Sequence, residues 1–451
     1  MKYYSTRSQQ IEAEFCDAVQ TALAPDGGLY VPAEFPHFPK GRCDYATLAA
    51  RIIAMFSGLD EQALLEQTME NYADFPIKLK ETESGTFLEL FHGPSGAFKD
   101  VALTMLPRIA TLCGQGKTTY VTATSGDTGK AAMEALKDRP DAKVMVFYPK
   151  DGVAFYQERQ MITQEGNNVR PVAIEGNFDD AQRAVKEILS AGFSHVSSCN
   201  SINIARLIAQ IPYYFYAAQK ADPDKPLIFF VPCGNFGNIL AGWYAKQMGL
   251  PIEKLVVCTN ENTVLRDFFE TGVYDRRREL VKTISPSMDI LVSSNLERLL
   301  YHLMGPEETA LRMIQLEEDG VFSVPVEILS DFSTYGATER DVHITTRTVL
   351  DEANYVIDPH TANARVAWEK FGRPENAIVL ATASPSKFPE PIVRMLQDET
   401  YGARGSLEEL KRYVDIHPAV EGIFQRPVRF TETIKPEEAM DVFTAFHEEE
   451  L

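Results

Sequence analysis

One lysine, Lys99, occupies a position that is unusual for a charged side chain. It follows a predicted apolar strand over residues 87–91 and a glycine- and proline-containing turn at 93–96, and it opens a predicted helix over residues 98–113. Because aromatic and apolar residues flank it, we expect its amine to be partly buried. Burial lowers the pKa of a lysine and makes the amine nucleophilic, which suits Schiff-base formation. The alternative is a solvated surface lysine in the first turn of a helix.

A hydroxyl-rich loop, residues 122–129, follows a second predicted strand and precedes a predicted helix. Ligands bind beyond the carboxyl ends of strands in open parallel sheets. Hydroxyl groups and backbone amides at a helix N-terminus form a site for a carboxylate or a phosphate. The alternative is that Ser125 or Asp127 only caps the helix.

A glycine-containing loop, residues 232–238, follows the strongly apolar predicted strand 227–231. Gly234 and Gly237 allow a ligand to approach the backbone closely, and the next helix supplies amides and a dipole. These features describe a phosphate cradle. The loop is not the dinucleotide fingerprint, because its spacing is G-x-x-G and no ribose-binding acid follows in register.

Two further segments carry polar groups in suitable places. Residues 381–387 follow a predicted strand, and their hydroxyl groups could hydrogen-bond a ring nitrogen or a substrate. Asn200 and Ser201 resemble caps of a predicted helix over residues 202–219. Arg206 lies close enough to the start of that helix to help bind an anion there.

From residue 87 onward, apolar strands alternate with helix-length segments. The predicted strands are residues 87–91, 119–123, 143–148, 169–174, 227–231, 255–259 and 377–381. The predicted helices include residues 98–113, 127–137, 179–189, 202–219, 236–248 and 306–317. Strands that are apolar throughout indicate parallel sheets covered on both faces, so we predict a doubly wound α/β fold.

The polar, proline-bearing stretch 221–226 marks a predicted domain boundary. Residues 1–85 would form an N-terminal region that packs on the core. Residues 86–221 would form a smaller α/β domain with Lys99 and the substrate loops, and residues 222–451 a larger α/β domain with the phosphate loop.

The composition limits the classes of partner. The chain has 451 residues, 45% of them hydrophobic, which is enough for two or more domains. Its formal net charge of -20 at pH 7 makes nucleic acid and anionic membranes unexpected partners. No run reaches the ~18 apolar residues of a membrane helix. Residues 1–20 show acidic residues and no apolar signal segment, so we expect a soluble cytoplasmic protein.

The six cysteines are scattered along the chain: Cys16, Cys43, Cys113, Cys199, Cys233 and Cys258. They form no CxxC pair and no Cys/His cluster, which argues against zinc and against a disulfide framework. We therefore expect buried, reduced thiols. The eight histidines show no metal-ligand spacing either, so no metal site is predicted.

A nucleophilic lysine, a phosphate cradle and hydroxyl loops together describe a pyridoxal phosphate enzyme. The sequence resembles the threonine synthase family, in its longer bacterial and fungal form, within the tryptophan-synthase-β-like group. The motifs HGP-x-x-AFKD at 92–100 and TSGDTG at 124–129 are the most discriminating. Further stretches match in family order, at residues 26–32, 175–180, 200–210, 234–238 and 380–390. The resemblance implies two doubly wound, mostly parallel-sheet domains that face a cofactor cleft, with an N-terminal extension.

The resemblance also implies a role for each candidate residue. Lys99 would be the catalytic residue and would form an aldimine with the cofactor, pyridoxal 5'-phosphate. Asp127 would lie near the cofactor's phenolic oxygen, and Thr382 would face its pyridine nitrogen. The cofactor phosphate would be held by Gly234, Asn235, Phe236, Gly237 and Asn238. The substrate carboxylate would be bound by Thr124, Ser125 and Thr128, and the substrate phosphate by Asn200, Ser201 and Arg206.

The implied reaction converts O-phospho-L-homoserine and water to L-threonine and phosphate. Lys99 would remove the α proton and then a β proton, phosphate would leave the γ carbon, and water would add at the β carbon. Three alternatives remain open. They are a lyase that releases a 2-oxo acid, a non-catalytic relative that binds pyridoxal phosphate or a phosphorylated metabolite, and a nucleotide-dependent dehydrogenase, which the missing fingerprint disfavours.

Overall fold

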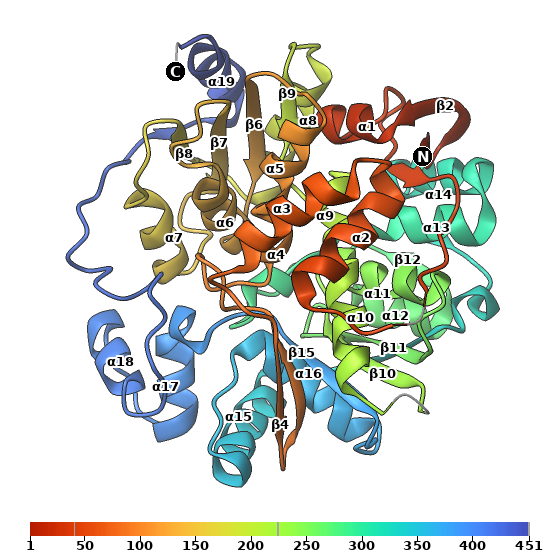
Figure 1. Cartoon of the computed structure of the whole chain (residues 1–451). Coiled ribbons are helices and arrows are strands. Elements are labelled where there is room, and N and C mark those ends of the chain that lie inside the picture. Colours follow the sequence, from red (N-terminus) through yellow and green to blue (C-terminus); the bar gives the residue numbers. More distant parts are fainter. Residues whose placement is uncertain (40, 223–224, 450–451) are drawn as a thin grey trace.

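Two large sheets organise the chain, and helices cover them (Figure 1). The computed structural model describes residues 1–39, 41–222 and 225–449. In the six-stranded sheet the spatial order is β14 (Phe332–Gly336), β11 (Ile252–Thr259), β10 (Leu227–Pro232), β15 (Ala377–Ala381), β5 (Gly85–Glu89) and β4 (Lys78–Thr82). In the five-stranded sheet it is β16 (Thr433–Ile434), β8 (Val169–Ile174), β7 (Ala142–Pro149), β6 (Thr118–Ala123) and β9 (Val196–Ser198).

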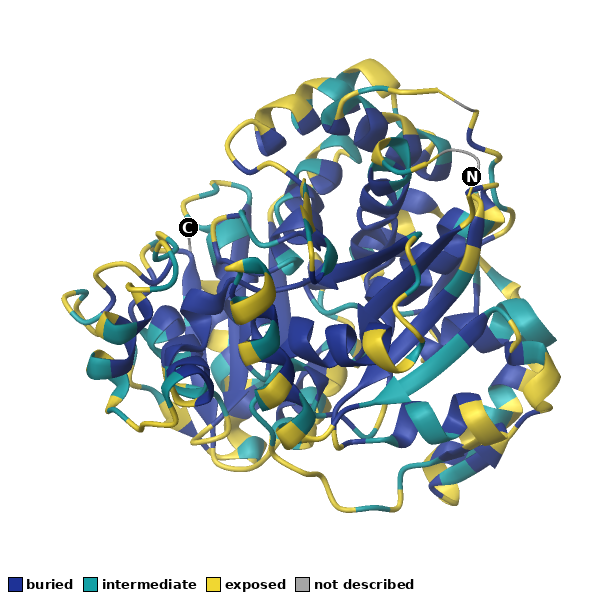
Figure 2. Ribbon diagram, turned by 90° about the horizontal axis from the view of Figure 1, so that it is seen from below, coloured by how far each residue is buried: buried dark blue, intermediate teal, exposed yellow. Residues whose placement is uncertain are grey.

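Every neighbouring pair in these two sheets is parallel except β4 and β5, which form an antiparallel pair at one edge. The central strands β6, β7, β10 and β15 are buried along their whole length. Figure 2 shows most of the sheet strands in the buried class, with exposed residues gathered on outer helices and loops. The structure thus confirms the predicted α/β class with parallel sheets.

Two smaller sheets contain the other strands of the described residues. The first comprises β2 (Ser8–Glu14), β1 (Lys2–Ser5) and β3 (Tyr30–Pro32), and the second comprises β12 (Val273–Asp275) and β13 (Val321–Ser323). The N-terminal segment packs on the rest of the chain. Tyr3 and Phe15 belong to the same buried cluster as Phe229 of β10, and the Tyr3 hydroxyl donates a hydrogen bond to Phe56 O at 2.9 Å.

The helices separate the strands, as expected for this class. They are α1 (Phe15–Thr21), α2 (Tyr45–Ser57), α3 (Glu61–Tyr72), α4 (Lys99–Leu103), α5 (Met105–Leu112), α6 (Asp127–Leu136), α7 (Phe155–Ile162), α8 (Phe178–Ser190), α9 (Ile204–Ile208), α10 (Ile211–Lys220), α11 (Gly237–Gln247), α12 (Val264–Thr271), α13 (Leu296–Met304), α14 (Pro306–Glu318), α15 (Glu339–Ala353), α16 (Pro359–Lys370), α17 (Pro389–Gln397), α18 (Ala403–Leu410) and α19 (Ala439–Glu448). Short 3-10 turns include η1 (Pro286–Met288) and η3 (Pro385–Lys387).

Two segments that were predicted as single helices each form two helices. The segment 98–113 forms α4 and α5, and the segment 202–219 forms α9 and α10. The reason is a proline in each case, because proline has no N–H to donate and its ring clashes with the carbonyl four residues earlier. Pro107 and Pro212 stand four residues after Leu103 and Ile208, which are the last residues of α4 and α9.

The division into residues 1–85, 86–221 and 222–451 remains a proposal. Each of the two large sheets contains strands from more than one of these parts. Strand β5 pairs with β15 in the six-stranded sheet, and β16 pairs with β8 in the five-stranded sheet. Of the predicted boundary 221–226, residues 223 and 224 lie outside the described part of the chain. Within that part, no helix is long and apolar enough to cross a membrane.

The expectation that all cysteines are reduced was wrong for one pair. Cys16 and Cys113 form a disulfide that connects α1 to the end of α5. The two residues are 97 positions apart in sequence, so their spacing gave no sign that the fold brings them together. Cys43, Cys199, Cys233 and Cys258 are free thiols, and the last three are buried.

Candidate active site

The backbone holds the lysine loop against the loop that follows β15. The Phe98 amide donates to the Thr382 carbonyl at 2.8 Å, and the Ser384 amide donates to the Gly96 carbonyl at 2.9 Å. Lys99 is the first residue of α4, directly after this contact. Two loops that are almost 300 residues apart are thereby fixed side by side, as ligand sites at strand ends require.

The Lys99 amine is largely withdrawn from solvent, because its side chain is only 13% exposed. It lies 3.8 Å from Asp127 Oδ2 and donates a long hydrogen bond of 3.4 Å to Ser287 Oγ. Burial lowers the pKa of Lys99 to about 8, although the Asp127 carboxylate opposes part of that shift. The predicted partial burial is confirmed, and the amine loses its proton far more readily than an exposed lysine.

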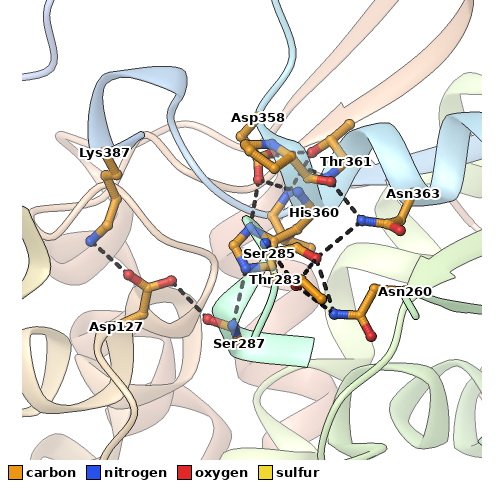
Figure 3. Close-up of polar contacts among 12 residues, drawn as sticks. Asp127, Asn260, Thr283, Ser285, Ser287, Asp358, His360, Thr361, Asn363 and Lys387 are labelled. Carbon is orange, nitrogen blue, oxygen red and sulfur yellow. Dashed lines mark hydrogen bonds and ion pairs between the residues drawn. The ribbon is translucent and has the colours of Figure 1, made fainter. Parts of the chain in front are cut away.

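Asp127 lies at the start of α6, and Lys387 and Ser287 contact its carboxylate (Figure 3). Its Oδ1 lies 3.0 Å from Lys387 Nζ and accepts from Gln157 Nε2 at 2.8 Å, while its Oδ2 accepts from Ser287 Oγ at 3.3 Å. Burial raises the pKa of the Asp127 carboxyl, but the positive charges of Lys387 and Lys99 outweigh it and hold this pKa well below its usual range. Asp127 is therefore a carboxylate at neutral pH.

The N-cap residue of α6 is Gly126, and neither Ser125 nor Asp127 caps the helix with its side chain. The Thr124 hydroxyl oxygen accepts from the amides of Gly126 at 2.9 Å and of Gly129 at 3.0 Å. The capping alternative for Ser125 and Asp127 is therefore wrong. A neighbouring contact anchors the end of β6, where the Asn200 side chain exchanges hydrogen bonds with the backbone N and O of Ala123, at 3.0 and 2.8 Å.

Arg206 is a buried cation without an acidic partner in the described part of the chain. Its side chain donates to the Cys199 carbonyl at 2.7 Å, its Nε has no hydrogen-bond partner among the described residues, and the residue is 4% exposed. Burial lowers its pKa to about 10. The N-cap of α9 is Asn203, so neither Asn200 nor Ser201 caps that helix. A desolvated, unpaired guanidinium attracts an anion.

The loop after β10 presents its backbone to the same space. Phe236 adopts a left-handed conformation, with φ 63°, and its ring stacks on Phe269 with centroids 5.5 Å apart. Gly237 then begins α11, whose first amides point out of the helix end. A Cβ at Gly234 would stand 2.4 Å from Ser287 O, so only glycine fits there. This is the geometry of an anion-binding loop.

The structure brings the predicted residues together around one cavity. Those that line it are Lys99, Thr124, Ser125, Thr128, Asn200, Ser201, Arg206, Gly234, Asn235, Phe236, Gly237, Asn238 and Thr382. Asp127 is the exception, because it lies behind the lining and contacts the Lys99 amine. The cavity thus brings together a buried amine, a glycine-containing loop at a helix start and a buried guanidinium.

Three residues of this region were missed by the sequence reasoning: Ser287, His360 and Lys387. Ser287 bonds to Lys99 and Asp127, and its amide donates to His360 Nε2 at 3.2 Å. His360 Nδ1 lies 2.8 Å from Asp358 Oδ1, and both residues are buried (Figure 3). Lys387 stood within the hydroxyl loop 381–387, whose position at a strand end was a usable signal. Ser287 lay in a segment without any motif.

Comparison with known proteins gives matches along most of the chain. The family model described as "Pyridoxal-phosphate dependent enzyme" matches residues 86–382, and that described as "Threonine synthase N terminus" matches residues 2–72. The threonine synthase of Eremothecium gossypii is 36% identical, with 98% of each chain covered. The threonine synthase of Pseudomonas aeruginosa is 38% identical, over 87% of this chain and 90% of that protein.

Solved structures agree with this result. A pyridoxal-phosphate-bound threonine synthase from Brucella melitensis has a TM-score of 0.84 and 34% identity, with 99% of each chain covered. The yeast threonine synthase has a TM-score of 0.88 and 32% identity, over 99% of this chain and 98% of that one.

Proposed function

The chain belongs to the threonine synthase family of pyridoxal-phosphate-dependent enzymes, and from this premise we propose how its own residues convert O-phospho-L-homoserine and water to L-threonine and phosphate. The observation that carries the proposal is one cavity lined by the buried amine of Lys99, the glycine-containing loop 234–238 and Arg206, which has no acidic partner among the described residues.

The residues around the cavity fit pyridoxal 5'-phosphate. The buried Asn238 Nδ2 has no hydrogen-bond partner among the described residues, and the backbone of residues 234–238 is open to a phosphate. We infer that Gly234, Asn235, Phe236, Gly237 and Asn238 hold the cofactor phosphate. Lys99 would hold the cofactor covalently, Asp127 would lie near its phenolic oxygen, and Thr382 would face its pyridine nitrogen. The Thr382 carbonyl is fixed by Phe98, which supports this placement.

When bound, the cofactor supplies an aldehyde for the amine and a ring that delocalises negative charge from the substrate carbons. The chain supplies the base. The Lys99 Nζ, whose pKa is about 8, takes the α proton and then a β proton of the substrate. An amine with a pKa near the working pH can both accept and return a proton, so one residue serves several proton transfers.

We assign the substrate carboxylate to Thr124, Ser125 and Thr128 at the start of α6. The helix dipole and the free amides there favour an anion. We assign the substrate phosphate to Arg206, with Asn200 and Ser201 beside it. Within the part of the chain that the structure describes, Arg206 has no acidic partner, which supports this assignment. Asn200 already bonds to Ala123 and contributes less.

We also propose that the chain works in the cytoplasm and that its partner is a small molecule. The net charge of -20 supports the exclusion of nucleic acid and anionic membranes. An anionic substrate then depends on local positive charge, and Arg206 provides it inside an acidic protein.

The decisive experiment is a product assay. The purified chain is incubated with O-phospho-L-homoserine, and threonine and phosphate are measured together. We expect equal amounts of both, and we expect the Lys99→Ala variant to produce neither. Phosphate accompanied by a 2-oxo acid would instead establish a lyase. Cofactor binding without any product would establish a non-catalytic relative.

A further inference from the structure

Lys387 is a fully buried lysine next to the proposed active site. It ends η3, six residues after strand β15, and its side chain is 0% exposed. Its amine donates to Ser95 O at 2.9 Å and to Gln160 Oε1 at 3.0 Å, and it lies 3.0 Å from Asp127 Oδ1. Each partner comes from a different segment, namely the lysine loop, α7 and α6.

Asp127 therefore stands between two lysines at unequal distances. Lys387 Nζ lies 3.0 Å from Oδ1, and Lys99 Nζ lies 3.8 Å from Oδ2 (Figure 3 shows the Lys387 contact). In the described residues, Asp127 is the one carboxylate within ion-pair distance of either amine. A single buried carboxylate can fully compensate only one ammonium group.

We propose that Lys387 is a positioning residue that occupies the Asp127 carboxylate, so that Lys99 is left as an amine able to lose its proton. This inference rests on the proposed role of Lys99 as the cofactor lysine. An amine condenses with an aldehyde only in its unprotonated form. The new N–C bond forms as the carbonyl oxygen leaves as water.

The charges around the two amines support this division of roles. Those facing Lys99 are Asp127, Arg206 and Lys387, and the two cations favour the neutral amine. Those facing Lys387 are Asp127, Asp100, Lys99, Lys130 and His417. Of the two acids, Asp127 is the one in direct contact with Lys387. Besides the two lysines, His360 also faces the Asp127 carboxylate. Without Lys387, Lys99 would be the one lysine left beside that carboxylate, which would then favour the protonated amine.

The test compares four full-length proteins: wild type, Lys387→Met, Lys387→Arg and Lys143→Met. Lys143 is a matched control, because it is also a buried lysine, but it donates to backbone carbonyls of the C-terminal segment, such as Phe446 O at 2.8 Å. Each protein is stripped of cofactor and reloaded with pyridoxal 5'-phosphate across a pH series. The rate is followed by visible absorption, and borohydride reduction with peptide mapping identifies the lysine.

In Lys387→Met we expect the pH midpoint of loading at Lys99 to rise by about one unit or more, the size of shift that a nearby opposite charge produces. At a pH below the midpoints of both proteins, Lys387→Met is loaded about tenfold more slowly than the wild type. Lys387→Arg keeps the positive charge, so its midpoint stays with that of the wild type. The Lys143→Met midpoint also stays there. A merely structural role for Lys387 would slow loading at every pH without moving the midpoint.

Asp127→Asn and the double variant Asp127→Asn/Lys387→Met provide a second comparison. It can be made even if Lys387→Met fails to fold. Asp127→Asn leaves Lys99 facing only cations, so its midpoint falls below the wild type. Adding Lys387→Met to that background removes one cation and raises the midpoint again. An unmoved midpoint in Lys387→Met, or in the double variant relative to Asp127→Asn, overturns the inference. Failure of the proposed function is separate, because the wild type would then carry no reducible cofactor on Lys99.

Discussion

The Phe98 amide and the Thr382 carbonyl are joined by a hydrogen bond of 2.8 Å. This bond fixes the residue before Lys99 to the end of β15, so the position of the amine is set by the backbone. The Lys99 side chain then needs no strong partner of its own, and its contacts are accordingly long, at 3.4 and 3.8 Å. A reactive amine can be placed accurately in this way without being held as a paired ammonium.

Two glycine substitutions in the loop 232–238 distinguish an effect on protein stability from an effect on cofactor binding. We expect Gly234→Ala to destabilise the chain itself, because the new Cβ would lie 2.4 Å from Ser287 O, and overpacking of this kind costs about 1–3 kcal/mol. Gly237→Ala is the matched variant, since its Cβ would meet Asn295 Nδ2 at 3.4 Å. Its cofactor-free melting temperature should therefore match the wild type, while its affinity for pyridoxal phosphate falls. Equal melting temperatures for both variants would contradict this account.

Removal of the Arg206 guanidinium should weaken substrate binding. We expect Arg206→Met to raise KM for O-phospho-L-homoserine about ten- to a hundredfold, the loss of one hydrogen bond to a charged group. Inorganic phosphate should inhibit the wild type more strongly than the variant. Arg277→Met is the control, because Arg277 is an exposed arginine that pairs with Asp275. An unchanged KM in Arg206→Met would remove Arg206 from the substrate site.

The buried Lys99 amine should cost stability in the cofactor-free protein. Its pKa in the folded chain is about 8, below the ordinary 10.5, so between these values the unfolded chain binds more protons. Stability of the wild type therefore rises with pH across this window, and the full cost is present below pH 8. At pH 7 we expect the free energy of unfolding of Lys99→Met to exceed that of the wild type by about 3 kcal/mol.

The gain in Lys99→Met should shrink as the pH rises from about 8 toward 10.5. Thermal or urea unfolding at several pH values measures it. The exposed Lys117→Met variant serves as the control and should show no such trend. A gain that does not change with pH would mean that packing, and not the ammonium charge, explains the difference.

The Cys16–Cys113 disulfide should be a measurable stabiliser. It closes a segment of the chain with a sequence separation of 97, and disulfides typically contribute about 2–4 kcal/mol. We expect a reductant to lower the melting temperature of the wild type and of Cys43→Ser, whose missing thiol is free in the structure. The reductant should leave Cys16→Ser/Cys113→Ser unaffected. A reductant effect in that double variant would point to a different cause.

The sequence predicts the central strands well because each is a short, wholly apolar run. Strand β15 is found at the predicted residues 377–381, and β8 at the predicted residues 169–174. The smaller strands were not predicted. For example, β4 is partly exposed and β16 has only two residues, so neither shows a continuous apolar run. The helix breaks after Leu103 and Ile208 could be read from Pro107 and Pro212, because proline cannot donate to the carbonyl four residues earlier.

The active site was predictable where motifs stood at strand ends and unpredictable where tertiary contacts decide. The loops of Lys99, Thr124 and Gly234 were identified from local pattern, and the structure brings them to one cavity. Ser287 comes from η1 and reaches Lys99 across 188 residues of sequence. No local rule relates such residues, because their proximity is a property of the folded chain.

The last strand of the five-stranded sheet comes from almost the end of the chain. Strand β16 pairs with β8 at the sheet edge, and α19 behind it supplies the Phe446 carbonyl to Lys143 on β7. During synthesis, the half of the site that carries Asp127 therefore has an open β edge until residues 433–434 have left the ribosome. An unfinished chain that lacks these residues exposes an edge that other strands can pair with.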